Sequence, residues 1–506
     1  MTDPSRLLIF IVAYNAERHI EKVLERIPKN TLAKYDYEIL LIDDQSKDAT
    51  FERALEYQKA HPELNLTVLY NPQNQGYGGN QKLGYHYARI NNFDMVLLLH
   101  GDGQYAPEEF ESLVTPIVKS NADAVFGSRM LNKKDALKGK MPYYKFVGNI
   151  VLTKMQNLIL NTHLSEFHSG YRAYRVSSLT RIPIERNSND FHFDTQIIIQ
   201  LIMAKMKIEE VPIPTHYGDE VCYVNGTQYA YNIIKASVHS RLQRLGIYYK
   251  REYDLDTPAQ PYRFKEGYLS THTRLLEKIN PGNNLLELGT CGGFLTDRLV
   301  SKGCKITGVD LELPANKDQY ISFIQSEPTS LINLPPADQF DIILLMDMLE
   351  TLEHPEIFLD QLRDYIKLST PTIYTSVANI GFFITRTQLF FGGFNYGRRG
   401  ILDLNHKRLY TKKSIKKLCE QSGMVVHKID PIPAPFPEAL GMNWFSRMLV
   451  QINNWLLPLS HGLFAYEYLL EIQAKPMVKH LIKYSIKASD IRKQVPTAAP
   501  KSINYG

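Results

Sequence analysis

Cysteine is scarce in this sequence, and its few cysteines show no regular spacing. The chain of 506 residues has four: Cys222, Cys291, Cys304 and Cys419. Zinc sites and disulfide frameworks need paired or closely spaced cysteines. We therefore expect reduced thiols and, with them, a cytoplasmic protein.

Long hydrophobic runs are also absent. A membrane-spanning helix needs about 18 to 20 consecutive apolar residues. The nearest candidate, residues 373–394, is interrupted by Arg386, by other polar residues and by glycines. The first six residues lead straight into an expected strand and do not have the form of a signal peptide. We expect a soluble protein, with peripheral contact to the cytoplasmic face of a membrane as the open alternative.

Neither sign of charge dominates the composition. The net charge of +5 is too small to predict a nucleic-acid partner, although it is compatible with an anionic membrane surface. The length exceeds what one hydrophobic core supports, so two or three domains are expected.

The segment from Asp94 to Gln104 best shows how the first half is organised. Five consecutive apolar residues, 95–99, predict a strand that is buried on both faces. If the backbone stays extended beyond it, His100, Asp102 and Gln104 lie on one side. Imidazole, carboxylate and amide groups could hold a divalent cation, or the phosphates that it carries. The alternative is a polar strand end with an Asp-Gly turn.

Strands and helices are expected to alternate along the first half. Apolar runs predict strands at residues 7–13, 37–42, 66–70, 95–99 and 122–127. Helical patterns lie between them, beginning with one from Tyr14 to about Ile27. This α/β order predicts a parallel sheet with right-handed crossovers, which binds ligands at the carboxyl ends of its strands.

Polar residues at these strand ends suggest a nucleotide site. Asp43 and Asp44 could accept hydrogen bonds from a base or ribose, and the glycines of residues 76–79 could let backbone amides approach phosphate. Arg129 could offset the charge of a diphosphate. Each feature has a simpler alternative. The two aspartates could form a turn with a helix cap, the glycines could belong to an ordinary loop, and Arg129 could form a surface ion pair. Their common position at strand ends favours the nucleotide site.

The motifs of the first half occur in a characteristic order. They are Ile11–Glu17, Ile42–Thr50, Gly101–Gln104, Gly127–Arg129, Gly148–Asn149, Ser169–Arg172 and Val211–Pro214. The series resembles family 2 glycosyltransferases, most closely the dolichol-phosphate mannose synthases and related polyprenyl-phosphate glycosyltransferases. The resemblance covers about residues 5 to 245.

This resemblance implies a glycosyltransferase A-type, Rossmann-like α/β sheet. It also implies inverting, metal-dependent transfer of a sugar from a nucleotide sugar to a lipid-phosphate or glycan acceptor. The implied nucleotide-sugar site comprises Ala13, Tyr14, Asn15, Glu17, Asp43, Asp44, Gly76 and Arg129.

The implied metal ligands are His100, Asp102 and Gln104, for Mg2+ or Mn2+. His100 replaces the aspartate of the family, and imidazole favours Mn2+. The implied catalytic residues are Asp102, Glu166 and Arg172. Glu166 could be the base that a hydroxyl acceptor needs, or simply the partner of Arg172.

A helix expected at residues 229–245 carries basic residues among apolar ones. It could lie on a membrane, or pack on its domain with a solvated basic face. We predict a first domain at residues 1–250 and a polar, proline-bearing linker at 251–262. A second domain follows at 263–475, and a basic tail at 476–506 that is expected to fray.

The second domain begins with a strand, a glycine turn and a second strand that ends on Asp310. An acidic residue about 20 positions after such a turn is typical of adenosine-ribose recognition. Glu287, Gly289 and Gly293 would line the pocket, and Asp310 would bind the ribose hydroxyls. A glycine loop alone would be weak evidence.

Four segments carry a second resemblance: Glu287–Gly293, Phe340–Ile343, Asp347–Glu350 and Gly400–Thr411. They resemble class I S-adenosylmethionine-dependent methyltransferases over about residues 262 to 475, again with a Rossmann-like α/β sheet. The implied S-adenosylmethionine site comprises Glu287, Gly289, Gly293, Asp310 and Asp347. Cys291 replaces a glycine of the family, and Thr351 a histidine.

His406 or Asp403 could serve as base for methyl transfer to oxygen, or both could brace a loop beneath a helix at residues 412–422. The sequence thus predicts a bifunctional enzyme of polysaccharide biosynthesis whose second domain methylates the saccharide. One alternative is a second domain that only binds S-adenosylmethionine or the acceptor. Another is a nucleotide-binding scaffold without transferase activity.

Overall fold

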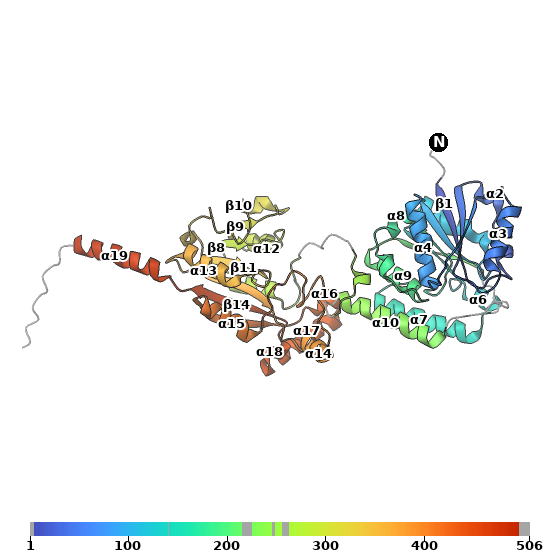
Figure 1. Ribbon diagram of the computed structural model, residues 1–506. Helices are drawn as coiled ribbons and strands as arrows, with labels where there is room; N and C mark the ends of the chain where they lie inside the picture. Colours follow the sequence, from blue (N-terminus) through green and yellow to red (C-terminus); the bar gives the residue numbers. More distant parts are fainter. Residues whose placement is uncertain (1–4, 140, 215–224, 245–247, 256–262, 495–506) are drawn as a thin grey trace, which may run out of the picture. The chain divides into compact units, whose positions relative to one another are not determined.

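The computed structural model describes residues 5–139, 141–214, 225–244, 248–255 and 263–494. The chain forms two compact units, the first comprising residues 1–244 and 248–258, and the second residues 245–247 and 259–506. Each unit contains one seven-stranded sheet flanked by helices (Figure 1). The predicted fold class, two α/β domains, is confirmed.

The strand order of the first sheet is β3-β2-β1-β4-β6-β5-β7. Its strands are β1 (Arg6–Ala13), β2 (Asp36–Asp43), β3 (Leu66–Tyr70), β4 (Met95–His100), β5 (Ala124–Ser128), β6 (Arg172–Arg175) and β7 (Ile208–Pro212). The prediction of a wholly parallel sheet is wrong for β6, which runs antiparallel to β4 and β5. β6 has only four residues, with an arginine at each end, so it contains no apolar run from which a strand could be predicted.

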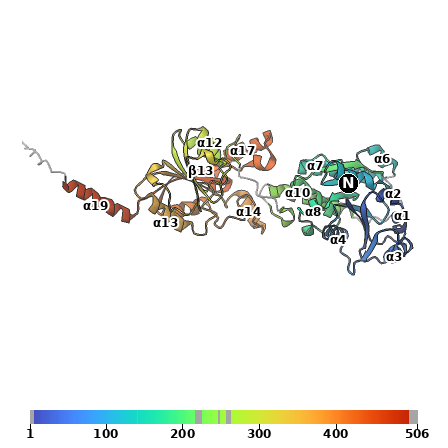
Figure 2. The same ribbon diagram turned by 90° about the horizontal axis from the view of Figure 1, so that it is seen from above.

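Helices cover both faces of this sheet (Figure 2). They are α1 (Ile20–Glu25), α2 (Lys29–Leu32), α3 (Thr50–Ala60), α4 (Tyr77–Ile90), α5 (Phe110–Lys119), α6 (Lys133–Lys138), α7 (Tyr143–Leu160), α8 (Val176–Leu179), α9 (Phe193–Met203) and α10 (Gly226–Arg244). One core joins the sheet to α1, α3 and α5, and another joins it to α4, α8 and α9. α1 begins later than predicted, because Asn15 takes a positive φ of 50° and residues 14–19 form turns.

α10 packs against α7 and α9 and buries Ile233, Ala236 and Ser240. These contacts favour the packed alternative for the predicted basic helix. Residues 215–224, just before it, lie outside the described residues. The start of the predicted linker also packs on the first unit, where Tyr253 of a short 3-10 helix (Arg251–Tyr253) is buried. Residues 256–262 are not described.

The strand order of the second sheet is β10-β9-β8-β11-β12-β14-β13. Its strands are β8 (Asn284–Leu288), β9 (Lys305–Asp310), β10 (Ser322–Gln325), β11 (Ile342–Leu345), β12 (Thr372–Ala378), β13 (Met424–Ile432) and β14 (Glu467–Ala474). β14 runs antiparallel to both of its neighbours. β10, a short edge strand, was not predicted from the sequence.

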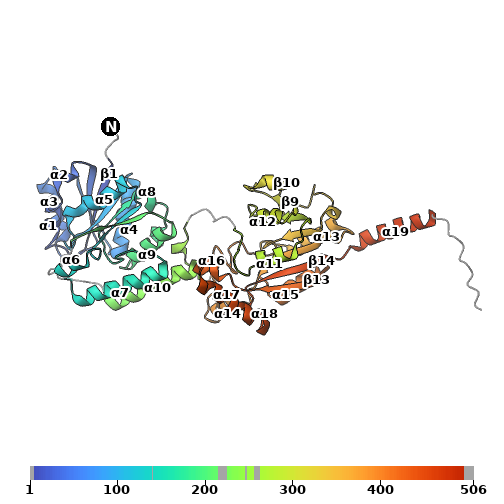
Figure 3. The ribbon, with the colours of Figure 1, turned by 180° about the vertical axis from the view of Figure 1, so that it is seen from behind.

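The helices of the second unit are distributed around this sheet (Figure 3). They are α11 (Thr271–Lys278), α12 (Thr296–Ser301), α13 (Pro355–Ile366), α14 (Phe383–Phe390), α15 (Lys412–Gln421), α16 (Phe436–Leu440), α17 (Trp444–Leu456), α18 (His461–Phe464) and α19 (Val478–Gln494). The start of the tail does not fray but forms α19. No helix of the described ranges is long and apolar enough to cross a bilayer.

Candidate functional site

A cavity of about 2280 Å3 opens at the carboxyl ends of the strands of the first sheet. Most of the residues that the sequence predicted for the glycosyltransferase site line it. They are Ala13, Tyr14, Asn15, Glu17, Asp44, Gly76, His100, Asp102, Gln104 and Arg129. Three predicted residues are not among the described residues that line it: Asp43, Glu166 and Arg172.

The chain turns directly after β4, so the backbone does not stay extended as far as Gln104. β4 ends at His100, and Gly103 takes a positive φ of 76°. The backbone amide of Gln104 then donates to Oδ1 of Asp102 over 3.1 Å. The turn nevertheless leaves His100, Asp102 and Gln104 in the same cavity wall.

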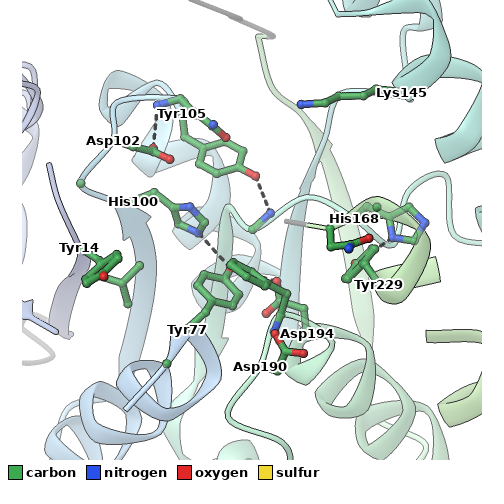
Figure 4. Close-up of a pocket in the computed structure, with 18 of the residues that line it drawn as sticks. Tyr14, Tyr77, His100, Asp102, Tyr105, Lys145, His168, Asp190, Asp194 and Tyr229 are labelled. Atoms are coloured by element: carbon green, nitrogen blue, oxygen red, sulfur yellow. Dashed lines mark hydrogen bonds between the residues drawn. The ribbon is translucent and has the colours of Figure 1, made fainter. Parts of the chain in front are cut away.

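His100 is held by a hydrogen-bond network in the cavity wall (Figure 4). Its Nε2 lies 3.1 Å from the hydroxyl of Tyr77, which donates to Oδ2 of Asp194 over 3.0 Å. Because the single hydroxyl proton goes to Asp194, Nε2 of His100 must donate, and Nδ1 keeps the lone pair. Burial lowers the pKa of His100 and favours this neutral form.

Gly170 is required for this packing, because a Cβ there would lie 2.5 Å from Nε2 of His100. A neutral imidazole, a carboxylate and an amide oxygen are suitable ligands for Mn2+ or Mg2+. The described residues contain no group of three His, Cys, Asp or Glu side chains that could hold a metal. The three predicted ligands would therefore need the phosphates of a nucleotide to complete the coordination, and the metal site stays a prediction.

Glu166 pairs with Arg129, so its suggested pairing with Arg172 is wrong. Its carboxylate accepts from the backbone amide of Arg129 over 2.7 Å and from Nε over 3.1 Å. Nδ2 of Asn149 donates to it over 2.7 Å. Burial alone would raise the pKa of Glu166, but Arg129 and Asn149 outweigh it and hold the pKa below its ordinary value. A buried, ionised and fully paired carboxylate fits the positioning of Arg129 better than general base catalysis.

Arg172 is buried beneath the cavity, which does not support its predicted catalytic role. It is 1% exposed and donates to the backbone carbonyls of Ser169, Asp194 and Phe167 over 2.7, 3.1 and 3.0 Å. Arg172 therefore ties the loop before β6 to the first turn of α9. This structural role could not be distinguished from catalysis by sequence alone, because the motif shows only that an arginine stands two residues after Gly170.

Two glycines in the first turn of α4, Gly78 and Gly79, serve packing, whereas the predicted nucleotide contact of Gly76, which lines the cavity, stays a prediction. The amides of Gly78 and Gly79 donate to the carbonyl of Asn189 over 2.8 and 3.4 Å. A Cβ on Gly78 would lie 2.5 Å from the carbonyl oxygen of Ser188. The turn is glycine-rich because the loop before α9 crosses it closely.

Asp43 also has a structural role. It is buried, and its carboxylate accepts from the amide and hydroxyl of Ser46, which fixes the loop after β2. Asp44 remains in the cavity wall, where its Oδ1 accepts from the amide of Gln75 over 2.8 Å. Only the second aspartate of the pair is thus placed to meet a ligand.

Sequence reasoning missed several cavity residues, among them Lys145, His168 and Tyr229 (Figure 4). Nδ1 of His168 lies 3.1 Å from the hydroxyl of Tyr229, and its Nε2 is buried without a hydrogen-bond partner among the described residues. Burial lowers the pKa of His168 to about 4, so the ring is neutral. The signal in the sequence that could have identified His168 was its position two residues before Gly170 of the motif.

In the second unit, Asp310 spans the glycine turn that follows β8. Its Oδ2 accepts from Oγ1 of Thr290 over 3.1 Å and from the amide of Cys291 over 2.9 Å. Cys291 adopts a positive φ of 46°, between Gly289 at 80° and Gly292 at 81°. The turn thus keeps left-handed geometry although cysteine replaces the middle glycine of the family. Asn316 leaves no room for a Cβ at Gly293.

Of the other predicted cofactor residues, Glu287 is buried and Asp347 is half-buried. Burial raises the pKa of Glu287 to about 8, even though Thr296 and Tyr320 contact its carboxylate. Asp347 takes a positive φ of 50°, and its amide donates to Oγ of Ser376 over 2.8 Å. Burial would raise the pKa of Asp347, but the nearby ammonium of Lys265 and the hydrogen bond from Ser376, among other groups, together outweigh burial and lower it.

The contacts of His406 and Asp403 stabilise the loop that carries them. Nε2 of His406 lies 3.3 Å from Oε1 of Glu350, and its Nδ1 lies 3.0 Å from the carbonyl oxygen of Ile401. Asp403 accepts from the amide of Asn405 over 2.8 Å. Both contacts match the bracing alternative, and a role as base stays a prediction.

Comparison with known proteins agrees with this geometry. Residues 8–182 match the family model of glycosyl transferase family 2, and residues 260–429 match that of a methyltransferase domain. The chain joins a family 2 glycosyltransferase domain to a methyltransferase domain. Both are enzyme domains, so the predicted recognition and the prediction of an enzyme are confirmed.

Relatives of the glycosyltransferase domain are found in archaea and bacteria. One is UDP-N-acetylglucosamine–dolichyl-phosphate N-acetylglucosaminyltransferase of Methanococcus voltae, 28% identical over 42% of this chain and 86% of the relative. Another is polyprenol monophosphomannose synthase of Mycolicibacterium smegmatis, 25% identical over 41% of this chain and 76% of the relative. A solved structure, glucosyl-3-phosphoglycerate synthase from Mycobacterium tuberculosis, aligns with a TM-score of 0.36 and 16% identity over 47% of this chain and 80% of that chain. This structural similarity is too distant to inform the site.

Proposed function

We propose that the glycosyltransferase domain transfers a sugar, with inversion, from a nucleotide sugar to a lipid phosphate or glycan in a metal-dependent reaction. One observation carries the proposal: a single cavity brings together Asp44, Arg129 and the Asp102 turn. These groups come from the ends of three different strands, and together they offer partners for a base or ribose, a diphosphate and a cation. The names of the relatives, which refer to dolichyl phosphate and polyprenol, support a lipid-phosphate acceptor.

Different cavity residues would bind different parts of the nucleotide-sugar donor. Tyr14, Asn15 and Asp44 surround the nucleoside, and Arg129, fixed by Glu166, faces the diphosphate. His100, Asp102 and Gln104 would hold Mg2+ or Mn2+. When bound, the ion neutralises charge on the departing diphosphate. The bond from the anomeric carbon to the diphosphate oxygen breaks, and an acceptor oxygen bonds to that carbon from the opposite face.

A phosphate acceptor explains why the cavity wall needs no carboxylate base in the place of Glu166. A lipid phosphate is already anionic, so no proton must be removed before attack. Lys145 and His168 line the cavity and offer cationic and neutral donors to such a phosphate. If Tyr229 donates to Nδ1 of His168, then Nε2 carries the proton that a phosphate oxygen would accept.

The lipid part of the acceptor would follow α7, which begins at the cavity. Tyr143 and Tyr144 line the cavity and are 74% and 73% exposed. An exposed apolar stripe continues along the helix through Val147, Val151 and Leu158. α7 has no acidic residue, so peripheral contact with an anionic membrane surface is compatible with its charge.

We propose that the methyltransferase domain binds S-adenosylmethionine through Glu287, Gly289, Gly293, Asp310 and Asp347, and methylates the saccharide. Asp310, which stands at the end of β9, would accept from the ribose hydroxyls. The alternative, a module that binds S-adenosylmethionine or the acceptor without catalysis, keeps support from the bracing contacts of His406 and Asp403.

A transfer assay tests the proposal directly. Purified protein is incubated with labelled UDP- or GDP-sugars, polyprenyl phosphate, and Mn2+ or Mg2+, and label in the lipid phase is counted. Asp102→Ala should abolish the transfer, whereas Asp36→Ala, which changes an exposed aspartate of β2, should not. Labelled methyl groups from S-adenosylmethionine should then appear on the glycolipid. Cofactor binding without any methyl transfer would favour the non-catalytic module.

A further inference from the structure

Two segments of the methyltransferase domain lack acidic residues altogether. None occurs between Asp364 and Asp403, or between Glu438 and Glu467. The first segment contains α14 and the second contains α17 and α18. Their exposed arginines are Arg386, Arg398, Arg399 and Arg447. Both segments therefore present positive charge without compensation from acidic side chains of their own.

The two segments meet in space, and Figures 1 and 3 show α14, α17 and α18 at the same edge of the domain. The rings of Phe383 and Phe464 lie 6.3 Å apart. Nδ2 of Asn379 donates to the carbonyl of Ala465 over 2.7 Å. These contacts join α14 to α18, and α18 in turn contacts α17.

α17 departs from the usual amphipathic pattern, because it buries two polar residues and exposes large aromatic ones. Ser446 and Asn453 are buried. Oγ of Ser446 donates to the carbonyl of Gly441 over 2.7 Å, and Oδ1 of Asn453 accepts from the amide of Ala434 over 2.7 Å. Trp444 and Trp455, in contrast, are 75% and 80% exposed. A helix that faces water normally shows the opposite arrangement.

α14 repeats the pattern. Its one buried residue is Thr385, whereas Phe390 and Phe391 at its end are 85% and 79% exposed. We call the exposed side chains of Phe390, Phe391, Trp444 and Trp455 the aromatic face. These exposed aromatics belong to segments that contain exposed arginines and no acidic residue. Such a combination matches the headgroup zone of a bilayer, where amphipathic rings and cations are both stabilised.

We propose that the aromatic face docks the methyltransferase domain on an anionic lipid bilayer. The rings would enter the headgroup region, and the four arginines would meet lipid phosphates. Charge complementarity selects this occupant, because the two segments that carry the face contain exposed arginines and no acidic residue, which suits anionic lipid. Docking requires neither nucleotide nor S-adenosylmethionine, so it can be tested independently of the proposed catalysis.

Tryptophan fluorescence gives a selective test, because the two tryptophans of the chain both lie on this face. With the full chain, vesicles of phosphatidylglycerol and phosphatidylcholine should shift the emission to the blue, and brominated lipids should quench it. Pure phosphatidylcholine vesicles should bind several-fold more weakly, and salt should weaken binding to the anionic ones.

A double variant separates this face from other contacts and retains both tryptophans. Phe390→Ser with Phe391→Ser should weaken vesicle affinity about tenfold or more, because two exposed rings lose their buried state in lipid. Ile332→Ser, which changes another exposed apolar side chain of the domain, is the matched control and should bind like the wild type. Circular dichroism and thermal melting should show that both variants fold.

Three results would overturn the proposal. Vesicle binding without any change in tryptophan emission would place the membrane contact elsewhere. An emission shift that depends on protein concentration without lipid would show that a second copy of the chain covers the face. Absence of binding to anionic vesicles at low salt would show that the face does not dock on lipid.

Discussion

The hydroxyl of Tyr77 lies 3.1 Å from Nε2 of His100 and donates its proton to Asp194. Tyr77 and Asp194 thus determine which nitrogen of the histidine keeps a lone pair. Outer contacts of this kind orient a metal ligand and set its tautomer. The glycine-rich segment that carries Tyr77 therefore contributes to the site through this tyrosine.

Tyr77→Phe should weaken metal-dependent nucleotide binding about tenfold, because His100 loses the acceptor that fixes its tautomer. The ring contacts of Tyr77 with Phe191 remain possible in the variant. Titration calorimetry with Mn2+ would measure the change. Tyr85→Phe removes another buried hydroxyl of α4, which donates to Gln81, and serves as control. Equal losses in the two variants would contradict the special role of Tyr77.

Glu166→Gln should raise the KM for the donor and destabilise the glycosyltransferase domain by about 3–5 kcal/mol, because Arg129 loses its buried anionic partner. Steady-state kinetics over a pH series and denaturant melting would measure both effects. We expect the shape of the kcat profile to be unchanged, as for a positioning residue. A kcat about 100-fold lower at unchanged KM, with loss of the acidic limb, would instead identify Glu166 as the base.

Gly78→Ala should destabilise the glycosyltransferase domain by about 1–3 kcal/mol, because its Cβ would collide with Ser188 and Phe193. Gly148→Ala provides the contrast: this residue lies inside α7 with nothing within 4 Å of the added Cβ. It should stabilise the helix by about 0.5–1 kcal/mol. Urea titration would compare the two. Stability equal to wild type in Gly78→Ala would mean that the glycine serves a ligand and not packing.

The pKa of Glu287, raised to about 8 by burial, predicts a pH-dependent stability. Between about pH 5 and pH 8 the unfolded chain releases this proton while the folded domain retains it, so stability falls as pH rises. Each pH unit should cost the wild type up to about 1.4 kcal/mol relative to Glu287→Gln. Thermal melting at several pH values would show the two curves diverging. Parallel curves would show that Glu287 is ionised in the folded domain.

The central strands could be predicted from the sequence because their apolar runs reflect burial on both faces. Leu97, Leu98 and Leu99 are at most 1% exposed, with β1 and β6 on either side. β6 and β10 could not be predicted in this way. Each has four residues, and its place in the sheet is set by tertiary pairing and not by its own hydrophobicity.

The candidate site could be predicted as far as strand ends determine it. Asp44, Asp102 and Arg129 follow three different strands and do reach one cavity. The errors concern partners that are distant in sequence. The carbonyl of Asn189 accepts from the amides of Gly78 and Gly79, and Glu166 pairs with Arg129 rather than with Arg172. Such pairings depend on how loops cross the sheet edge, which periodicity does not encode.

The central claim, a metal-dependent nucleotide site at Asp102, is tested most directly by calorimetric titration of the full chain with UDP and GDP. Each nucleotide is added with Mn2+, with Mg2+ and with chelator. We expect one nucleotide to bind in the presence of metal, and Asp102→Ala to lose that binding while its melting curve stays that of a folded protein. Nucleotide binding that is unchanged by chelator and by Asp102→Ala, or no binding under any condition, would contradict the account.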